Sequence, residues 1–523
     1  MISEPRADSL VNLDSSEEIK ALPSRRILEG LPERRIPLGE TPPDAVPHEA
    51  LLQFADEAAW DQFLAAAFGS DVVLGENEVL RVVRVDLRRL WDNADLRQLA
   101  EDAEWEHHYH VYAPDLPFLP EGGNEVPFGA HAARAVGFPD ARDQWGRGVR
   151  IAVMDTRVAQ QHPALAHLSI AQFDFLGEGS WESSSGYQGH GTAVLSILAG
   201  QGSSLPALAP GADLSVYRVL DDSGIGTSFA IANAIVAAAD AGNQIISLSL
   251  GTYQNSSILH EAVRYAQSRG VTLVAAAGND GVQGRVLYPA AYDGVVSVGA
   301  VDAQWQRAGF SNQGSSLDLA APGVGIPAAW WEDDAAPDLE GVVWFTGTSA
   351  STPFVVGAMA GLLSQDPTLL PGDALDFLKK YANDAGKPGK DDEFGHGIMN
   401  VQRVLERNTS GIHDVALAGV WAEPVSSGSL ATVELTLNTE NRGTENIPAV
   451  TLHVRDAHGI HRTYTMGGLA PNQSRAHTIQ IPVNFGMNNQ PVEMEAWVEM
   501  HGARDRDPDN NSGRIVIQQH PGD

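Results

Sequence analysis

The spacing of apolar and polar positions changes along the chain and divides it into segments of different character. Residues 1–46 are polar, interrupted by prolines and without a sustained period, which predicts a flexible leader. Residues 47–112 combine alternating stretches with helical spacing in the order β-α-β-β-α-β, which predicts a ferredoxin-like α+β unit. Its expected elements are strands at Ala50–Phe54, at Val72–Val85 (two strands) and at Trp105–Tyr112, and helices at Glu57–Phe68 and Leu87–Ala100.

A stretch rich in proline and glycine follows at residues 113–126 and is expected to be an exposed linker. From residue 127 to 408, continuous apolar stretches alternate with helical patterns. Strands that are apolar throughout and separated by helices indicate a parallel sheet covered on both faces, hence an α/β fold. The strands are expected near residues 149–154, 214–219, 244–250, 271–277 and 295–300, and the helices at Thr192–Ala199, Ser228–Ala241, Ile258–Ser268, Ser349–Ser364 and Gly372–Tyr381.

Helical spacing stops in the last segment, residues 409–523. Short alternating stretches such as A-T-V-E-L-T-L and V-T-L-H-V are separated there by Gly, Asn and Pro. This pattern predicts an all-β sandwich of antiparallel strands, a module that could bind a protein partner.

Composition narrows the function. The 523 residues include 34 Lys and Arg against 67 Asp and Glu, a net charge of −33, which argues against nucleic-acid partners and anionic membrane surfaces. The absence of cysteine excludes thiol catalysis and disulfides. No stretch approaches the roughly 18 apolar residues of a membrane helix, and the start lacks a signal-peptide pattern. We therefore expect no membrane insertion and a cytoplasmic protein, with secretion as the alternative.

Three short motifs carry candidate chemistry: V-M-D-T-R around Asp155, G-H-G-T around His190 and G-T-S-A-S-T-P around Ser349. Acyl transfer needs a nucleophilic oxygen, a base that takes its proton and an acid that orients the base. The motif V-A-A-A-G-N-D places Asn279 just past a strand end, where its amide could help to bind an oxyanion. The motif S-L-S-L-G at residues 247–251 is typical of an edge strand that pairs with an extended peptide. Together the motifs predict a hydrolase.

These motifs, in the order Asp, His, Ser, resemble the subtilisin-like serine proteases from about residue 126 to 404. The resemblance implies a serine endopeptidase whose substrates are proteins or peptides. It further implies Ser349 as the nucleophile, His190 as the general base and Asp155 as its orienting acid. Asn279 and the backbone N–H of Ser349 would form the oxyanion hole.

The same resemblance assigns the walls of the substrate cleft. One strand of the cleft would be Ser249, Leu250 and Gly251, the opposing strand Gly224, Ile225 and Gly226, and the further pocket wall Ala277 and Gly278. Leu287 stands where much of the family has a small residue. We therefore expect a shallow pocket that prefers small or medium apolar residues before the cleaved bond.

Two positions depart from the family pattern. Arg157 stands at a usual glycine, so it would either strain the turn or place a cation near Asp155. Ala164 stands where the family's strong calcium site usually has an aspartate. No cofactor is expected to be required, and calcium is possible although this usual ligand is absent.

The flanking segments resemble accessory modules. Residues 47–112 stand in the place of the family's inhibitory propeptide, which would make the protein a zymogen with its processing site in the linker at 113–126. The last segment loosely resembles bacterial immunoglobulin-like adhesion modules. The alternatives are a catalytically impaired pseudoprotease that binds peptides or a partner protein, and a scaffold that acts through its sandwich.

Two polar clusters allow more than one interpretation. The first combines Glu106 with His107, His108 and His110, and suits a solvated strand, a pH-sensitive contact of the N-terminal unit or metal ligands. The second, at residues 505–510, suits a turn or a calcium loop.

Overall fold

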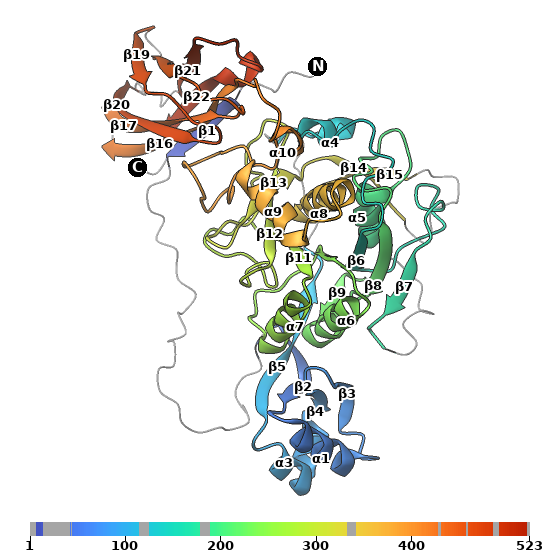
Figure 1. Ribbon diagram of the computed structural model, residues 1–523. Coiled ribbons are helices and arrows are strands. Elements are labelled where there is room, and N and C mark those ends of the chain that lie inside the picture. The colour runs from blue at the N-terminus through green and yellow to red at the C-terminus, as the bar shows by residue number, and fades with distance from the viewer. Residues whose placement is uncertain are drawn as a thin grey trace.

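The computed structural model describes residues 7–13, 42, 44–114, 125–177, 189–331, 341–426, 430–456, 459–484 and 491–519. A small α+β unit, a central α/β unit and an all-β unit follow one another along the chain (Figure 1). Residues 115–124, most of the expected linker, lie outside the described residues.

The central unit contains a seven-stranded sheet in the order β13-β12-β11-β10-β6-β8-β7, and each adjacent pair is parallel. This confirms the predicted α/β fold, although the sequence did not reveal the outer strands β7 and β13. The strands are β6 (Arg150–Asp155), β7 (Ala171–Asp174), β8 (Asp213–Arg218), β10 (Ile245–Leu248), β11 (Thr272–Ala276), β12 (Val296–Val301) and β13 (Leu319–Pro322).

Helices cover both faces of this sheet, because successive strand side chains point to opposite sides and both sets are apolar. In β6, Ile151 and Val153 belong to one core cluster, while Ala152 and Met154 belong to the other. The first face carries α5 and α8, and the second carries α6 and α7, which lie towards the N-terminal unit (Figure 1). The remaining elements are α4 (Ala132–Ala135), α5 (Gly189–Ala199), β9 (Ile225–Thr227), α6 (Ser228–Asp240), α7 (Ser257–Ser268), β14 (Ile326–Ala329), β15 (Val342–Phe345), α8 (Thr348–Gln365), α9 (Pro371–Lys380), α10 (Val401–Glu406) and the 3-10 turn η1 (Gly129–His131).

The N-terminal unit has the predicted β-α-β-β-α-β order, and its sheet order is β3-β4-β2-β5. The prediction of one continuous helix at Leu87–Ala100 is wrong, because this segment forms two short helices. Asn93 lies at the break with φ −108° and ψ 103°, and its side chain accepts a hydrogen bond from the backbone N–H of Leu96, which caps the second helix. The elements are β2 (Ala45–Gln53), α1 (Glu57–Ala67), β3 (Val73–Asn77), β4 (Val82–Asp86), α2 (Leu87–Asp92), α3 (Ala94–Leu99) and β5 (Glu104–Tyr112).

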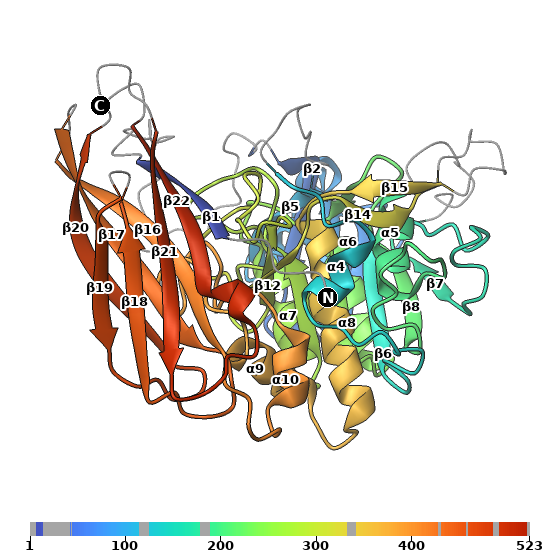
Figure 2. The ribbon, with the colours of Figure 1, turned by 90° about the horizontal axis from the view of Figure 1, so that it is seen from above.

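The C-terminal unit, at the left of Figure 2, consists of two sheets whose inner faces share one apolar core. One sheet has the order β16-β17-β20 and the other β1-β22-β21-β18-β19. Their strands are β16 (Val415–Ser426), β17 (Leu430–Asn441), β18 (Ala449–Arg455), β19 (His461–Met466), β20 (Ser474–Asn484), β21 (Val492–His501) and β22 (Ser512–Gln519), with the 3-10 turn η2 at Pro508–Asn511.

The strand β1 corrects the prediction of a flexible leader. Residues Ala7–Leu13 pair in parallel with β22, more than 500 positions away in the chain. A short strand at a sheet edge depends on main-chain hydrogen bonds to its neighbour, so its own seven residues give little signal. Most other positions of the leader lie outside the described residues.

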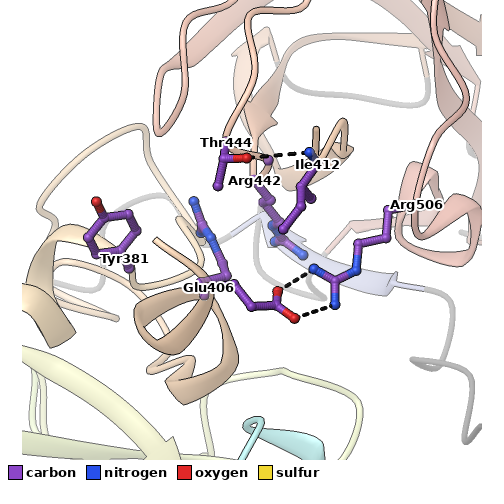
Figure 3. Close-up of a pocket in the computed structure, with 8 residues that line it drawn as sticks. Tyr381, Glu406, Ile412, Arg442, Thr444 and Arg506 are labelled. Carbon is purple, nitrogen blue, oxygen red and sulfur yellow. Dashed lines mark hydrogen bonds and ion pairs between the residues drawn. The ribbon is translucent and has the colours of Figure 1, made fainter. Parts of the chain in front are cut away.

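A buried ion-pair network joins the C-terminal unit to the central unit. The carboxylate of Glu440 on β17 is 2.7 Å from Nη1 of Arg403 and 3.1 Å from Nε of Arg442, and it accepts the backbone N–H of Asp384 at 3.1 Å. Beside it, Arg506 forms a two-pronged contact with Glu406 across the same junction (Figure 3). These ion pairs fix the C-terminal unit to the central unit.

No helix in the described parts of the chain is long and apolar enough to cross a membrane.

We expect Glu440→Ala to lower the free energy of unfolding by about 3–5 kcal/mol, because it leaves two arginines buried without their carboxylate. Thermal unfolding followed by calorimetry measures this. The control is Glu495→Ala, which removes the exposed partner of Arg455, 3.1 Å away, and should have no measurable effect. Equal effects of the two variants would contradict the structural role of the network.

Candidate active site

The predicted acid and base meet at the carboxyl edge of the parallel sheet, where such folds collect their functional groups. Asp155 ends β6, and His190 is the second residue of α5. Nδ1 of His190 is 2.8 Å from Oδ1 of Asp155, and both side chains are fully buried. Oδ1 also accepts the backbone N–H of Thr156 at 2.7 Å. The carboxylate therefore fixes the imidazole with Nδ1 towards it and Nε2 away from it.

Two glycines explain how the chain packs so tightly around His190. A Cβ at Gly189 would lie 2.3 Å from the ring of Trp330, and one at Gly191 would lie 2.8 Å from the carbonyl oxygen of Thr156. The G-H-G motif is thus a steric requirement of the site.

Ser349 lies in the first turn of α8, directly after Gly347 and Thr348. It is 1% exposed, and neither its Oγ nor Nε2 of His190 has a hydrogen-bond partner among the described residues. The backbone N–H groups of a first helical turn have no intrahelical acceptor, and the helix dipole favours negative charge there. Ser349 therefore stands where a developing anion would be stabilised.

Asn279 follows β11 and is held by Thr348, the residue before the serine. Its Oδ1 accepts the backbone N–H and the hydroxyl of Thr348, both at 2.8 Å. These two bonds fix the plane of the amide and turn its nitrogen end away from Thr348.

The expected substrate walls also lie at this edge. The hydroxyl of Ser249 donates to the carbonyl oxygen of Ser349 at 3.2 Å, so this wall is tied to the start of α8. Leu250 points into the core beneath α6 and α7 and contributes only backbone to the cleft.

Leu287 fills the space between the walls. Its backbone N–H donates to the carbonyl oxygen of Ala277 at 3.0 Å. A Cβ at Gly251 or at Gly278 would approach Leu287 atoms to 2.7 Å and 2.8 Å, respectively. The leucine side chain thus occupies the volume between Gly251 and Gly278, where a large substrate side chain would otherwise enter.

The chain's own residues lie between the two predicted walls as an added strand. Tyr112 at the end of β5 pairs with Ile225 of β9 on one side. On the other side it exchanges two hydrogen bonds with Gly251, of 3.0 Å and 2.9 Å. The next residue, Ala113, donates to the carbonyl oxygen of Gly224 at 2.8 Å. Both walls therefore bind extended backbone, as β-strand addition requires.

The structure shows the surroundings of Arg157 and Ala164, the two positions that depart from the family pattern. Arg157 does not take the left-handed backbone conformation, so the turn after Asp155 is not strained in that way. Ala164 is buried against Leu205 and Ala329, an apolar setting. Among the residues the structure describes, no three His, Asp or Glu side chains gather to hold a metal ion.

The histidine cluster is not a fully solvated strand. His108 is 1% exposed, its Nδ1 is 2.8 Å from Oε2 of Glu49, and its ring lies edge-on to Phe229 of α6. Burial lowers the pKa of His108. At the second cluster, the amide nitrogen of Asn510 donates to Asp414 at 3.0 Å and η2 forms a turn.

Comparison with known proteins agrees with this geometry. The model of the subtilase family (Peptidase_S8) matches residues 146–397. Alkaline elastase YaB from Bacillus sp. (strain YaB) is 32% identical over 364 residues, which cover 68% of this chain and 88% of that protein. This chain belongs to the subtilase family. The thermostable alkaline protease of Halalkalibacterium halodurans is 36% identical over 267 residues, 51% of this subtilase and 70% of the relative. Subtilisin E of Bacillus subtilis (strain 168) is 33% identical over 327 residues, which cover 60% of this chain and 79% of that protein. The protein is accordingly a serine endopeptidase.

Sequence reasoning missed the residues that hold the site of this subtilase together. Thr348 belongs to the G-T-S-A-S-T-P motif, but the motif does not predict its hydrogen bond to Oδ1 of Asn279. Thr156 accepts the backbone N–H of Gly191 through its hydroxyl, at 3.0 Å, and so joins the acid and base segments. These contacts connect segments distant in sequence, and no local pattern reports them.

We expect Leu287→Gly to open the pocket and to raise kcat/KM for peptides with phenylalanine before the cleaved bond, relative to alanine, by at least ~10-fold. Hydrolysis of paired chromogenic peptides measures the ratio. The control is Val286→Ala, because Val286 is buried in the neighbouring core and should leave the ratio unchanged. A wild-type enzyme that already prefers aromatic residues would contradict a shallow pocket.

Proposed function

We propose that this subtilase cleaves peptide bonds through an acyl-enzyme formed on Ser349, with His190 as base and Asp155 as its orienting acid. The observation that carries the proposal is the buried 2.8 Å contact between Nδ1 of His190 and Oδ1 of Asp155, with the ring of His190 edge-on to Phe345, three residues before α8 begins. Because Nδ1 faces the carboxylate, Nε2 is the nitrogen available to exchange protons.

In the proposed reaction, Oγ of Ser349 attacks the substrate carbonyl carbon while Nε2 of His190 takes the hydroxyl proton. Asp155 stabilises the resulting imidazolium. The oxyanion accepts hydrogen bonds from the backbone N–H of Ser349 and from the side-chain amide of Asn279. His190 then gives its proton to the leaving amine. Water, deprotonated by the same nitrogen, hydrolyses the acyl-enzyme and regenerates the serine.

We further propose that the protein is a self-inhibited zymogen, in which the ferredoxin-like N-terminal unit blocks the cleft. The pairing of Tyr112 with both walls supports this, since a peptide substrate would need the same hydrogen-bonding groups. Continuing the antiparallel register from Tyr112 opposite Gly251 brings Pro114 opposite Ser249, whose hydroxyl contacts Ser349. Pro114 is then the residue before the bond presented for cleavage.

A second contact supports the inhibitory role. The carboxylate of Glu106 on β5 accepts the backbone N–H groups of Ser257 at 2.7 Å and of Ile258 at 3.3 Å, and the hydroxyl of Ser257. Ser257 and Ile258 are the first two residues of α7. The side-chain carboxylate of Glu106, from the N-terminal unit, therefore caps a helix of the central unit. The N-terminal unit is thereby held at a point away from the cleft as well.

For the C-terminal unit we propose an immunoglobulin-like β-sandwich that binds a protein partner while fixed to the catalytic unit. The two sheets around one core and the Glu440 network support a rigidly attached module.

We expect purified wild-type protein to release an N-terminal fragment that ends at Pro114, while Ser349→Ala remains intact because it lacks the nucleophile. Intact-mass spectrometry of both proteins after incubation measures this. A pseudoprotease would leave both proteins whole, and would also fail to react with a serine-directed phosphonate. Cleavage at another bond would contradict the proposed register but not the activity.

Asn279→Ala should reduce kcat by roughly 10²–10³-fold with little change in KM, because the lost donor acts on the oxyanion and not on the bound substrate. Steady-state kinetics on the processed enzyme measures both constants. A rise in KM at constant kcat would instead indicate a role in substrate binding.

A further inference from the structure

A buried asparagine outside the proposed catalytic residues lies behind the oxyanion-binding loop. Asn312 belongs to the loop between β12 and β13 and is fully buried. A buried amide costs free energy unless its donors and acceptor are all bonded. The partners of Asn312 therefore show what the buried amide is used for.

Every hydrogen-bonding group of its side chain is used, and most of the partners flank Asn279. Oδ1 accepts the backbone N–H groups of Asp280 at 3.1 Å and of Val282 at 3.0 Å. Nδ2 donates to the carbonyl oxygen of Ala277 at 3.3 Å. The side chain thus holds the loop on both sides of Asn279 at once.

The backbone of Asn312 adds a further bond, because its N–H donates to the carbonyl oxygen of Gly278 at 3.1 Å. Gly278 has a φ of +112°, and a Cβ there would lie 2.3 Å from Nδ2 of Asn312. Glycine adopts such a φ readily, and its missing Cβ leaves room for the amide of Asn312. Asn312 therefore packs directly against the residue before Asn279.

The same amide reaches the opposite wall of the cleft. Nδ2 of Asn312 donates to the hydroxyl of Tyr253 at 3.2 Å, and that hydroxyl donates to Oδ2 of Asp280 at 2.5 Å. Burial raises the pKa of Tyr253 to about 12, so the hydroxyl keeps its proton at neutral pH. Tyr253 lies two residues past Gly251. Asn312 therefore connects the wall around Gly251 with the loop that carries Asn279.

We propose that Asn312 is a positioning residue for the oxyanion hole: it sets the orientation of Asn279 and the spacing of the two walls through Tyr253. The inference rests on the proposed role of Asn279. An amide is required at this place, because an aspartate of the same shape would lose both donors and set a negative charge against the carbonyl oxygen of Ala277. An alanine would remove the three side-chain bonds to the loop and the one to Tyr253.

The test compares Asn312→Ala with Asn243→Ala in the processed enzyme. Asn243 is a matched control in the same unit, since its buried amide donates to the carbonyl oxygen of Ala238 and to the hydroxyl of Tyr217. We expect Asn312→Ala to lower kcat by roughly 10- to 100-fold with KM within about 2-fold, because a small displacement of a catalytic group is costly. The control variant should lose comparable thermal stability and keep its kcat.

A double-variant cycle separates positioning from general damage. In the Asn279→Ala background, Asn312→Ala should have little further effect on kcat, since it acts through the amide already removed. The affinity for a peptide aldehyde, whose adduct with Ser349 carries the oxyanion, should fall by the same factor as kcat in the single variant. If Asn312→Ala does not fold, Tyr253→Phe removes one link and should give a smaller loss of the same kind.

Equal losses in both backgrounds, or an equal loss in the Asn243→Ala control, would overturn the positioning role. If Asn279→Ala itself leaves kcat unchanged, the proposed oxyanion hole fails instead. If Asn279→Ala is impaired but Asn312→Ala and Tyr253→Phe are not, only the inference about Asn312 fails.

Discussion

The burial of both faces of the seven-stranded parallel sheet is the constraint on which the rest of the molecule depends. Apolar side chains point alternately into two helix-covered cores, so neither face can present polar chemistry. Only the edge at which the strands end is open to loops that carry polar groups. Asp155 ends β6, while Ser249 and Asn279 follow β10 and β11, so all three lie at this edge.

The site at this edge is held by connections between loops. Thr156 ties the acid segment to the helix of His190, Thr348 ties the serine helix to Asn279, and Asn312 ties that loop to the opposite wall. Each link is a hydrogen bond of 2.8–3.2 Å between segments that are remote in sequence. Catalytic geometry of this kind needs such support, because small displacements cost much of the rate.

The two flanking units contact the central unit through different kinds of interaction. The N-terminal unit extends its own sheet through β5 into β9 and so enters the cleft as backbone. The C-terminal unit stays away from the cleft, attached by the charged network around Glu440 at the far side of the sheet (Figure 1). One contact is made through main-chain pairing of β5 with β9, and the other through charged side chains.

The sequence by itself determined the central fold, because runs such as 151–154 and 273–277 are apolar at every position and only a doubly covered strand buries both sides. Local motifs also predicted the four residues of the proposed site, Asp155, His190, Ser349 and Asn279. Tertiary structure alone decided the strand β1, the break at Asn93 and the roles of Thr348 and Asn312. Pairing of distant edges and satisfaction of buried amides depend on partners far away in the chain, and no local pattern encodes them.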